Sequence, residues 1–248
     1  MDEVLIITGA SRGIGAATAR IAGRSGYVVC VNYLKNKAAA KQIVEEINAD
    51  GGRALAVGAD ISREEEVVKL FCTVDDKLGK ISALVNNAGI LETQMRIEDM
   101  NEARLNRIFL TNITGSFLCA REAVKRMSTK NGGKGGAIVN VSSAAARLGS
   151  AGEYVDYAAS KGAVDTFTRG LAQEVAGEGI RVNAVRPGVI DTDIHASGGE
   201  PGRVERVKAS IPMKRGGSAE EVAKAIMWLL SSESSYTTGS LLEVSGGR

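Results

Sequence analysis

The 248-residue sequence has few of the residues that support disulfide frameworks, metal sites or membrane spans. Its three cysteines, Cys30, Cys72 and Cys119, are widely spaced among apolar neighbours, so we expect buried, reduced thiols. It has one histidine, and we expect no metal site. No apolar run is long enough to span a bilayer, and residues 1–3 lead directly into a strand rather than into a basic leader segment. These shortages favour a cytoplasmic protein with no membrane partner.

The sequence also lacks an excess of either charge. Its 31 basic and 29 acidic residues give a net charge of +2, so no polyanionic partner is implied. Nucleic acid and anionic membrane surfaces are therefore disfavoured as partners. The length suits an α/β domain with a substantial core, and no shift in composition marks a second domain. We therefore treat residues 1–248 as a single domain.

Short apolar runs alternate with amphipathic stretches along the whole chain. This alternation predicts a parallel sheet that is covered by helices on both faces. The predicted strands are residues 4–8, 28–32, 54–57, 83–86, 137–141, 181–185 and 241–244. The predicted helices are residues 13–26, 37–49, 67–78, 108–124, 157–176 and a last helix that Ser218 caps.

Two segments do not fit the alternation. Residues 131–136 are rich in glycine and read as a flexible connection. Residues 189–215 contain Gly198, Gly199, Pro201 and Gly202, which suits a mobile flap over a site. An ordinary surface excursion is the alternative for this second segment.

A cluster of glycines joins the first predicted strand to the first helix. Gly9, Gly13 and Gly15 allow the backbone to approach a pyrophosphate, and the N–H groups of the helix N-terminus face that anion. The spacing differs from the common G-x-G-x-x-G of dinucleotide-binding proteins. A purely structural turn would need the same glycines, but the position between strand and helix favours a nucleotide site.

The end of the second predicted strand carries no carboxylate. Residues 31–35 read Val-Asn-Tyr-Leu-Lys, whereas an acidic residue usually binds the ribose hydroxyls of NAD at this place. Its absence, together with Arg12 and Lys35, favours NADP(H), with NAD(H) as the other possibility. Solvated surface charge is the alternative for both basic residues. Asp60, which follows the third strand, either accepts the adenine amino hydrogen or caps the helix that begins near Ser62.

Tyr157 and Lys161 stand four residues apart in a predicted helix. At this spacing the Lys161 ammonium can lie beneath the Tyr157 hydroxyl, where it would lower the pKa of the phenol. The pair alone is a weak signal, because a surface pair has the same spacing. Ser142 and Ser143 precede it, and the Asn86-Asn-Ala-Gly89 motif lies further upstream.

Taken together, these motifs resemble the short-chain dehydrogenase/reductase family. The matching residues occur in the family's order over essentially the whole chain: Thr8-Gly-x-x-x-Gly-x-Gly15, Asn86-Asn-Ala-Gly89, Asn112, Ser143, Tyr157, Lys161 and Pro187-Gly188. The resemblance implies a doubly wound Rossmann-like domain that forms a homotetramer or homodimer. It also implies an oxidoreductase for a small carbonyl or alcohol substrate, similar to sugar dehydrogenases and to 3-oxoacyl-carrier-protein reductases.

The resemblance assigns roles to individual residues. Tyr157 is the expected general acid and base, and Ser143 is expected to bond the substrate oxygen. Lys161 would hold the ribose of the nicotinamide half, and Asn112 would anchor a water that links Lys161 to solvent. The expected cofactor contacts are Gly9, Ser11, Arg12, Gly13, Ile14, Gly15, Asn32, Tyr33, Asp60, Ile61, Asn87, Ala88, Gly89, Tyr157, Lys161, Pro187, Gly188, Val189 and Thr192.

Some residues have rival interpretations. The interval between Ser143 and Tyr157 is one residue longer than the family's usual spacing, which makes Ser142 a rival serine and predicts a bulge toward the substrate within 149–156. Tyr154 has no lysine four residues on, so we interpret it as substrate wall or packing. For His195 we expect an incidental, solvent-facing side chain, with contact to substrate or pH sensing as the alternative. For Arg147 we expect a surface position, with contact to an acidic substrate as the alternative.

Two other classes of function compete with catalysis by this oxidoreductase. An NADP(H)-binding sensor without turnover would not need Ser143, Tyr157 and Lys161, all of which are present. An epimerase or dehydratase on the same fold usually adds a substrate domain, for which this chain is short.

Overall fold

The structure is a computed structural model that describes residues 3–248. Its described part forms one parallel sheet of seven strands in the order β3-β2-β1-β4-β5-β6-β7. The strands are β1 (Val4–Ile7), β2 (Val28–Tyr33), β3 (Arg53–Gly58), β4 (Ile81–Asn86), β5 (Gly136–Val141), β6 (Ile180–Pro187) and β7 (Leu241–Val244). The predicted parallel sheet with helices on both faces, and the Rossmann-like fold class, are confirmed.

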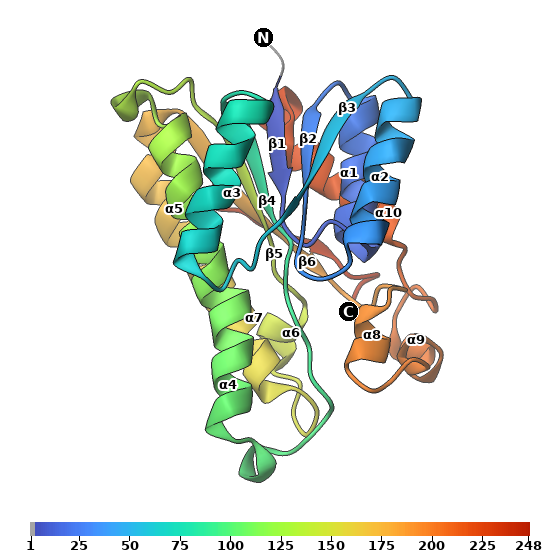
Figure 1. The fold of residues 1–248 in the computed structure, drawn as a ribbon. Helices are drawn as coiled ribbons and strands as arrows, with labels where there is room; N and C mark the ends of the chain where they lie inside the picture. The colour runs from blue at the N-terminus through green and yellow to red at the C-terminus, as the bar shows by residue number, and fades with distance from the viewer. Residues whose placement is uncertain (1–2) are drawn as a thin grey trace.

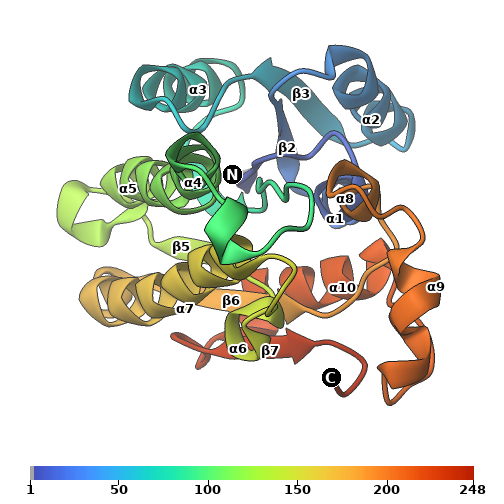
Figure 2. The same cartoon turned by 90° about the horizontal axis from the view of Figure 1, so that it is seen from below.

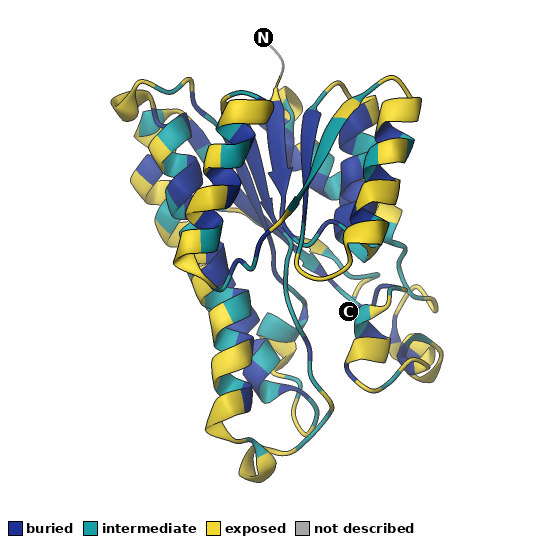
Figure 3. Cartoon of the chain, viewed as in Figure 1, coloured by how far each residue is buried: buried dark blue, intermediate teal, exposed yellow. Residues whose placement is uncertain are grey.

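Helices cover each face of the sheet, as Figure 1 shows. One face packs against α1 (Gly13–Arg24), α2 (Lys37–Ala49) and α10 (Ala219–Leu230). The other packs against α3 (Glu64–Lys77), α5 (Gly115–Met127) and α7 (Val155–Val175). Successive strand side chains point to opposite faces, so Leu5 and Ile7 join the first core and Val4 and Ile6 the second. The central strands are therefore mostly apolar and buried over most of their length (Figure 3).

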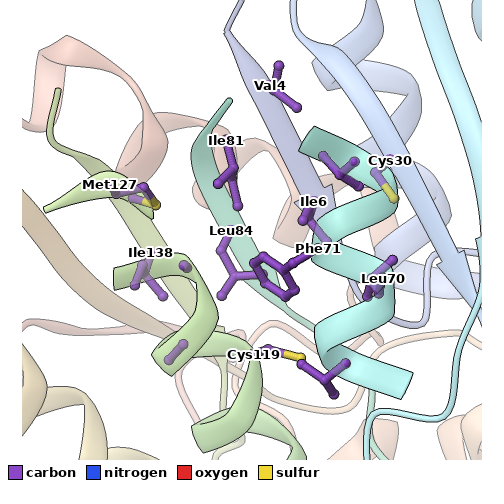
Figure 4. Packing of buried hydrophobic residues seen from close by; sticks show 14 of the residues in the cluster. Val4, Ile6, Cys30, Leu70, Phe71, Ile81, Leu84, Cys119, Met127 and Ile138 are labelled. Atoms are coloured by element: carbon purple, nitrogen blue, oxygen red, sulfur yellow. The ribbon is translucent and has the colours of Figure 1, made fainter. Parts of the chain in front are cut away.

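The second core also contains two of the cysteines. Cys30 and Cys119 lie among Phe71 and Leu84 (Figure 4), and burial raises the pKa of each thiol to about 12. Cys72 is exposed, so the expectation of three buried thiols is wrong for this residue. It follows Phe71 on α3, whose apolar face already points into the core, and successive helical residues point in different directions.

Caps and short helices account for the remaining local structure. The Ser218 hydroxyl accepts from the Glu221 N–H while the Glu221 carboxylate accepts from the Ser218 N–H, so the predicted cap of α10 is a capping box. The predicted helix over 108–124 is divided into α4 (Glu102–Phe109), a π-helical turn (Leu110–Thr114) and α5. The 3₁₀ turns are Ile97–Asp99, Thr129–Asn131, Ala176–Glu178, Lys208–Ser210 and Ser232–Ser234.

Several short elements lie beyond the carboxyl ends of the strands. Figures 1 and 2 show α4 and α6 (Ala145–Leu148) on one side of this region, and α8 (Ile194–Ser197) and α9 (Arg203–Val207) on the other. Because β1 lies between β2 and β4, the chain reverses direction across the sheet there, and such a point leaves a crevice at the carboxyl ends. None of the helices within residues 3–248 is long and apolar enough to cross a membrane.

Candidate active site

A cavity of about 900 Å³ lies at the carboxyl ends of the central strands. It brings together most of the residues predicted from the sequence: Gly9, Ser11, Arg12, Gly13, Ile14, Asn32, Asp60, Ile61, Asn87, Ala88, Gly89, Ser143, Tyr157, Lys161, Pro187, Gly188, Val189 and Thr192. The predicted residues outside its lining are Gly15, Tyr33 and Asn112. Segments from the N-terminal turn at Gly9 to Thr192 therefore meet around this cavity.

The turn after β1 is built from backbone in conformations that favour glycine. Gly9 and Gly13 have φ of +62° and +56°, and a Cβ on Gly9 would lie 2.9 Å from Ala88 Cα. The Asn87 amide holds the turn by donating to the carbonyls of Thr8 and Gly9 at 2.8 and 3.0 Å. A side chain at Gly9 would therefore require a strained backbone and a shift of Ala88.

The N-terminus of α1 faces the cavity in a form suited to an anion. Its N-cap, Arg12, makes no side-chain cap bond, and its first turn has no acidic residue. The first N–H groups of a helix lack helical partners and carry partial positive charge. Together with the glycine backbone, they provide the donors that a pyrophosphate needs.

The end of β2 places its side chains differently from the prediction. The Asn32 amide is engaged by backbone: its oxygen accepts from Gly9 N–H at 3.2 Å and its nitrogen donates to the carbonyls of Val57 and Ala59. Asn32 thus ties together the ends of three strands. The Tyr33 ring lies against Gly58 rather than in the cavity lining. Its neighbours Leu34, Lys35 and Asn36 line the cavity instead, and of these only Lys35 was singled out from the sequence.

Asp60 lies at the cavity but does not cap α3, one of the two roles that its sequence position allowed. It lines the cavity, and its Oδ1 accepts from the N–H and the hydroxyl of Ser62 at 2.9 and 2.7 Å. Helix α3 begins only at Glu64, with Arg63 as its N-cap. Asp60 therefore shapes the turn before the helix rather than capping the helix itself.

Ser143, Tyr157 and Lys161 meet where β5 ends against α7. A hydrogen bond joins the Ser143 and Tyr157 side chains, and Ala145 N–H donates to Ser143 Oγ at 3.1 Å. Lys161 Nζ donates to the Val141 carbonyl at 2.7 Å and lies 5.6 Å from the centre of the Tyr157 ring. The rival serine, Ser142, donates instead to the Lys161 carbonyl at 3.2 Å. The geometry therefore favours Ser143 over Ser142 as the partner of Tyr157.

Burial controls the ionisation of this group. Burial raises the pKa of Tyr157, and the Ser143 hydrogen bond opposes that shift. Burial lowers the pKa of Lys161 to about 8, against the opposing charge of Asp165. The prediction of a lowered pKa for Tyr157 is therefore wrong in direction, because loss of solvation outweighs the neighbouring groups.

Asn112 lies behind the cavity wall, in the π-helical turn that interrupts α4 and α5. Its side chain donates to Ile90 O at 3.0 Å and to Ser160 Oγ at 3.1 Å, and it accepts from Ile90 N–H at 2.8 Å. Ser160 in turn donates to the Tyr157 carbonyl at 2.6 Å. Asn112 thus links the 86–90 segment to α7, and π-helical turns often mark such sites.

A buried ion pair fixes the start of α7 and was not predicted. Arg104 of α4 contacts Asp156 at 2.6 Å, with side chains only 3% and 0% exposed. Asp156 also accepts from Tyr157 N–H at 2.8 Å, and Arg104 donates to Thr93 O at 2.6 Å. An acidic residue in the first turn of a helix is a weak local signal for such a role. Nothing in the sequence pairs it with an arginine 52 residues upstream.

The segment with the extra residue before Tyr157 faces the cavity. Ser150, Ala151, Glu153 and Tyr154 all belong to the lining, and Ser150 has a φ of +49°. Tyr154 is 3% exposed, and the Arg203 guanidinium lies 5.2 Å from the centre of its ring. Tyr154 therefore forms part of the cavity wall, which is one of the two roles expected for it.

The segment expected as a flap is held to the rest of the site by ion pairs. Arg203 bridges Glu153 at 2.5 Å and Glu200 at 2.9 Å, and Arg206 pairs with both carboxylates. Gln94 donates to Glu200 at 2.6 Å, so three separate segments join there. Sequence reasoning missed this network, because no local pattern indicates which charges meet.

His195 contradicts the expectation of a solvent-facing side chain. It is 9% exposed, lines the cavity, and has Nε2 2.9 Å from the Ile190 carbonyl. His195 lies on α8, and its side chain points inward toward the backbone that follows β6. Burial is the largest influence on its pKa, which is lowered.

Other residues singled out from the sequence stand apart from the chemistry. Asn86, the first residue of the Asn86-Asn-Ala-Gly89 motif, is buried and donates to Ser116 O and Asn140 Oδ1 at 3.2 and 3.0 Å. Arg147 is half-exposed and 3.9 Å from Glu243, as expected of a surface residue.

Comparison with known proteins agrees with this fold. Residues 9–248 match the family described as "Enoyl-(Acyl carrier protein) reductase". The chain is 60% identical over 245 residues to "Uncharacterized oxidoreductase YgfF" of Escherichia coli, covering 99% of both proteins.

Two further curated relatives are similar over nearly their whole length. A 3-oxoacyl-[acyl-carrier-protein] reductase of Synechocystis is 40% identical, with 99% of this chain and 96% of that protein covered. Glucose 1-dehydrogenase 2 of Bacillus subtilis is 38% identical, with 99% and 94% covered. Among solved structures, a dehydrogenase/reductase from Sinorhizobium meliloti superposes with a TM-score of 0.91 at 31% identity, covering 99% of this chain and 94% of that one.

Proposed function

This chain belongs to the short-chain dehydrogenase/reductase family of oxidoreductases, and we propose that it transfers hydride between NADP(H) and a ketone or secondary alcohol, with Tyr157 as the general acid and base. The observation that carries this proposal is the meeting of Ser143, Tyr157 and Lys161 in the same cavity as the glycine turn of residues 9–15. We call the part of the cavity lined by Gly9, residues 11–14, Asn32 and residues 34–36 the nucleotide end. We call the part lined by residues 143–157 and 189–203 the substrate end.

The protonation state of Tyr157 suits reduction. Its raised pKa keeps the phenol protonated at neutral pH, so the hydroxyl has a proton to give to the oxygen that becomes an alkoxide. Ser143, which bonds the Tyr157 hydroxyl, is placed to bond the same substrate oxygen and to stabilise its developing charge. In the oxidative direction the phenolate would receive that proton.

The nucleotide fits the residues that line its end of the cavity. Bound NADP(H) would supply the hydride, and this chain's residues place it. The free N–H groups of α1 and the backbone of Gly9 and Gly13 would hold the pyrophosphate. Lys161 would hold the nicotinamide ribose, and Val189 and Thr192 would line the carboxamide.

The preference for NADP(H) rests on charge near the adenosine ribose. Arg12 and Lys35 both line the nucleotide end, and residues 31–36 contain no carboxylate to repel a 2′-phosphate. Arg12 also donates to Ser197 Oγ at 3.2 Å, so its guanidinium lies between the turn and α8. A guanidinium and an ammonium together attract the 2′-phosphate dianion of NADP(H) more strongly than they attract the two uncharged ribose hydroxyls of NAD(H).

The proposal extends to assembly and location. We propose a homotetramer, or a homodimer, in which the edge strand β7 contributes to a contact between copies. The free thiols of Cys30 and Cys119 suit the reducing cytoplasm, where we place the enzyme. We also propose that residues 189–215 move to admit substrate.

The test follows the absorbance of NADPH with a panel of ketones, aldoses and acyl thioesters, with NADH in parallel. We expect turnover that prefers NADPH. Absence of NADPH binding, measured by its fluorescence, would overturn the nucleotide assignment. Tight binding without turnover of any compound would favour a sensor over an enzyme.

A further inference from the structure

Asp165 is a buried carboxylate that the proposed reaction does not use. It lies on α7, the helix that also carries Tyr157 and Lys161. Its Oδ2 accepts from Nε and Nη2 of Arg186 at 3.0 and 2.7 Å. Its Oδ1 is buried and has no hydrogen-bond partner within residues 3–248. A buried carboxylate oxygen that bonds nothing costs free energy, so this one calls for an explanation.

The position of Asp165 on α7 brings its charge close to Lys161. The two residues are four apart in one continuous helix, so their Cβ atoms are neighbours at about 5–6 Å. Helical side chains lean toward the N-terminus, so the Asp165 carboxylate extends over the turn that carries Lys161. The residues are only 5% and 4% exposed, so little water screens the charge of either one. The Asp165 charge therefore acts on the Lys161 ammonium through the protein interior.

The uncharged groups around Lys161 Nζ come from three segments. Nζ donates to the Val141 carbonyl of β5 at 2.7 Å and lies 5.6 Å from the centre of the Tyr157 ring. A Cβ on Gly89 would lie 3.4 Å from both Nζ and Asn112 Oδ1, so the Asn112 amide faces the same space. None of these groups offsets the loss of solvation, because burial lowers the pKa of Lys161 to about 8 and the opposing influence is the charge of Asp165.

Arg186 does not cancel the charge of Asp165 completely. Its Nη1 donates to Glu243 at 3.0 Å, so one guanidinium serves two carboxylates. Arg186 and Glu243 are register partners on β6 and β7, which places their side chains on the same face of the sheet. Arg147 lies 3.9 Å from Glu243 but is half-exposed, so solvent screens its contribution. Asp165 therefore keeps negative charge that favours a second cation nearby.

We propose that Asp165 is a positioning residue for the reaction, whose charge keeps Lys161 in the ammonium form that would hold the nicotinamide ribose. The inference rests on the proposed function, because that function assigns the ribose to Lys161. Asp165 itself lies outside the cavity lining, so it acts through Lys161 and not on the nucleotide or the substrate. The chain of Asp165, Arg186 and Glu243 then sets the upper pH at which the enzyme binds its cofactor.

The first test measures NADPH affinity by fluorescence titration over a series of pH values. In the wild type the affinity should fall as pH rises through about 8, where Lys161 loses its proton. Asp165→Asn removes the charge and keeps the shape, so the fall should occur about one to two pH units lower. Asp165→Glu restores the charge and should return the fall close to the wild-type pH. The same shifts should appear in the pH–rate profile of NADPH-dependent reduction.

Arg186→Gln tests the same charge in the opposite direction. Glutamine can still donate to Asp165 Oδ2 but no longer neutralises it, so the loss of NADPH affinity should move to higher pH. General damage to the fold would not move the two variants in opposite directions. If Asp165→Asn does not fold, an unshifted profile of Arg186→Gln overturns the proposal by itself.

Asp75→Asn is the matched control for loss of a paired aspartate. Asp75 pairs with Arg126 at 2.7 Å, as Asp165 pairs with Arg186, and it lies on α3 outside the cavity lining. Its pH profile of NADPH affinity should equal that of the wild type. A shift as large as that of Asp165→Asn would mean that any lost ion pair has this effect, and would overturn the proposal.

A double-mutant cycle provides a readout that needs neither cofactor nor turnover. Denaturant unfolding of the wild type, Asp165→Asn, Lys161→Met and the double variant gives the coupling between the two side chains. The coupling should be favourable at about pH 6.5, where Lys161 is charged, and should vanish by about pH 9.5, where the folded protein has lost that proton. The same coupling at both pH values would show contact without charge and would overturn the proposal.

The outcomes separate this inference from the proposed function. NADPH binding with an unshifted pH profile in Asp165→Asn and Arg186→Gln would overturn the role of Asp165 and leave the oxidoreductase in place. Shifts of both variants in the same direction would also overturn it, since an effect of charge requires opposite signs. A pH-dependent coupling in a protein that binds no NADPH would support the hold of Asp165 on the Lys161 charge and overturn the proposed function.

Discussion

At the nucleotide end the turn after β1 is built from backbone and small residues, whereas the substrate end is held together by large polar and charged side chains from distant segments. Gly9 and Gly13 shape the first, with help from the Asn32 and Asn87 amides. Tyr154, His195 and the ion pairs of Arg203 shape the second. A turn that occurs in many proteins can therefore suit a widely used cofactor, whereas the choice of substrate depends on contacts between segments that are distant in sequence.

The largest expected effect comes from removal of the Tyr157 hydroxyl, where the nucleotide end meets the substrate end. Tyr157→Phe should lower kcat on the order of 10²–10⁴-fold, because the proton donor is removed. NADPH affinity, measured by fluorescence titration, should change little, because the nucleotide end is built separately. Retention of most of the turnover would remove Tyr157 as the acid.

A second prediction concerns pH and separates activity from stability at Lys161. The folded protein loses the Lys161 proton near a pKa of about 8, whereas an unfolded lysine keeps it to about 10.4. Between these values the unfolded state binds more protons, so this group makes the free energy of unfolding rise with pH. The gain relative to Lys161→Met should be on the order of 3 kcal/mol across the window.

Activity should move in the opposite direction over the same pH range. As pH rises through about 8, the ammonium that would hold the ribose is lost, and NADPH-dependent reduction should fall. Denaturant unfolding of wild type and Lys161→Met at several pH values, beside a pH–rate profile, tests both halves. A stability difference that stays flat with pH would show that Lys161 does not titrate there.

A third prediction tests the backbone character of the nucleotide end. Gly9→Ala combines a positive φ with a Cβ 2.9 Å from Ala88 Cα, whereas Gly26→Ala has a positive φ and no described atom within 4 Å. Gly9→Ala should therefore unfold more easily than Gly26→Ala by about 1–3 kcal/mol. Its NADPH affinity should fall roughly tenfold, a loss of about 1.4 kcal/mol. Equal behaviour of the two variants in unfolding and in NADPH titration would contradict a close-packed turn.

The smallest expected effect sharpens the cofactor preference. Arg12→Ala with Lys35→Ala should raise the KM for NADPH about tenfold and leave the KM for NADH nearly unchanged, since only NADPH carries the 2′-phosphate. Lys37→Ala is the control, because Lys37 is exposed and outside the cavity lining. An equal rise for both cofactors would place the selectivity elsewhere.

The same comparison explains what could be predicted from the sequence. All seven strands and the glycine turn are local patterns, and each was found from apolar runs or from Gly9 and Gly13. The Ser143–Tyr157 pairing followed from a motif that occupies one short stretch of chain. Its serine could be distinguished from Ser142 only in the structure, because both precede Tyr157 and only their partners differ.

The predictions that were wrong concern the direction in which a side chain points, the depth at which it is buried, or elements too short to show a pattern. Sequence position could not show that Tyr33 turns toward Gly58, or that His195 turns inward to the Ile190 carbonyl. The pKa of Tyr157 was misjudged because a favourable neighbour is visible in the sequence and the depth of burial is not. The short helices α6, α8 and α9 were missed because segments of four or five residues carry too little periodicity.

The buried pair of Arg104 and Asp156 has a consequence for how this enzyme can change over generations. Loss of either partner would leave an unpaired buried charge, which costs about 3–5 kcal/mol, a large share of the stability of most domains. Exchange of both for apolar residues can be tolerated, so the accessible route needs two substitutions together. A mutant library that varies only one of the two positions at a time would yield destabilised proteins at either position. A library that varies both positions together would sample new placements of the helix that carries Tyr157.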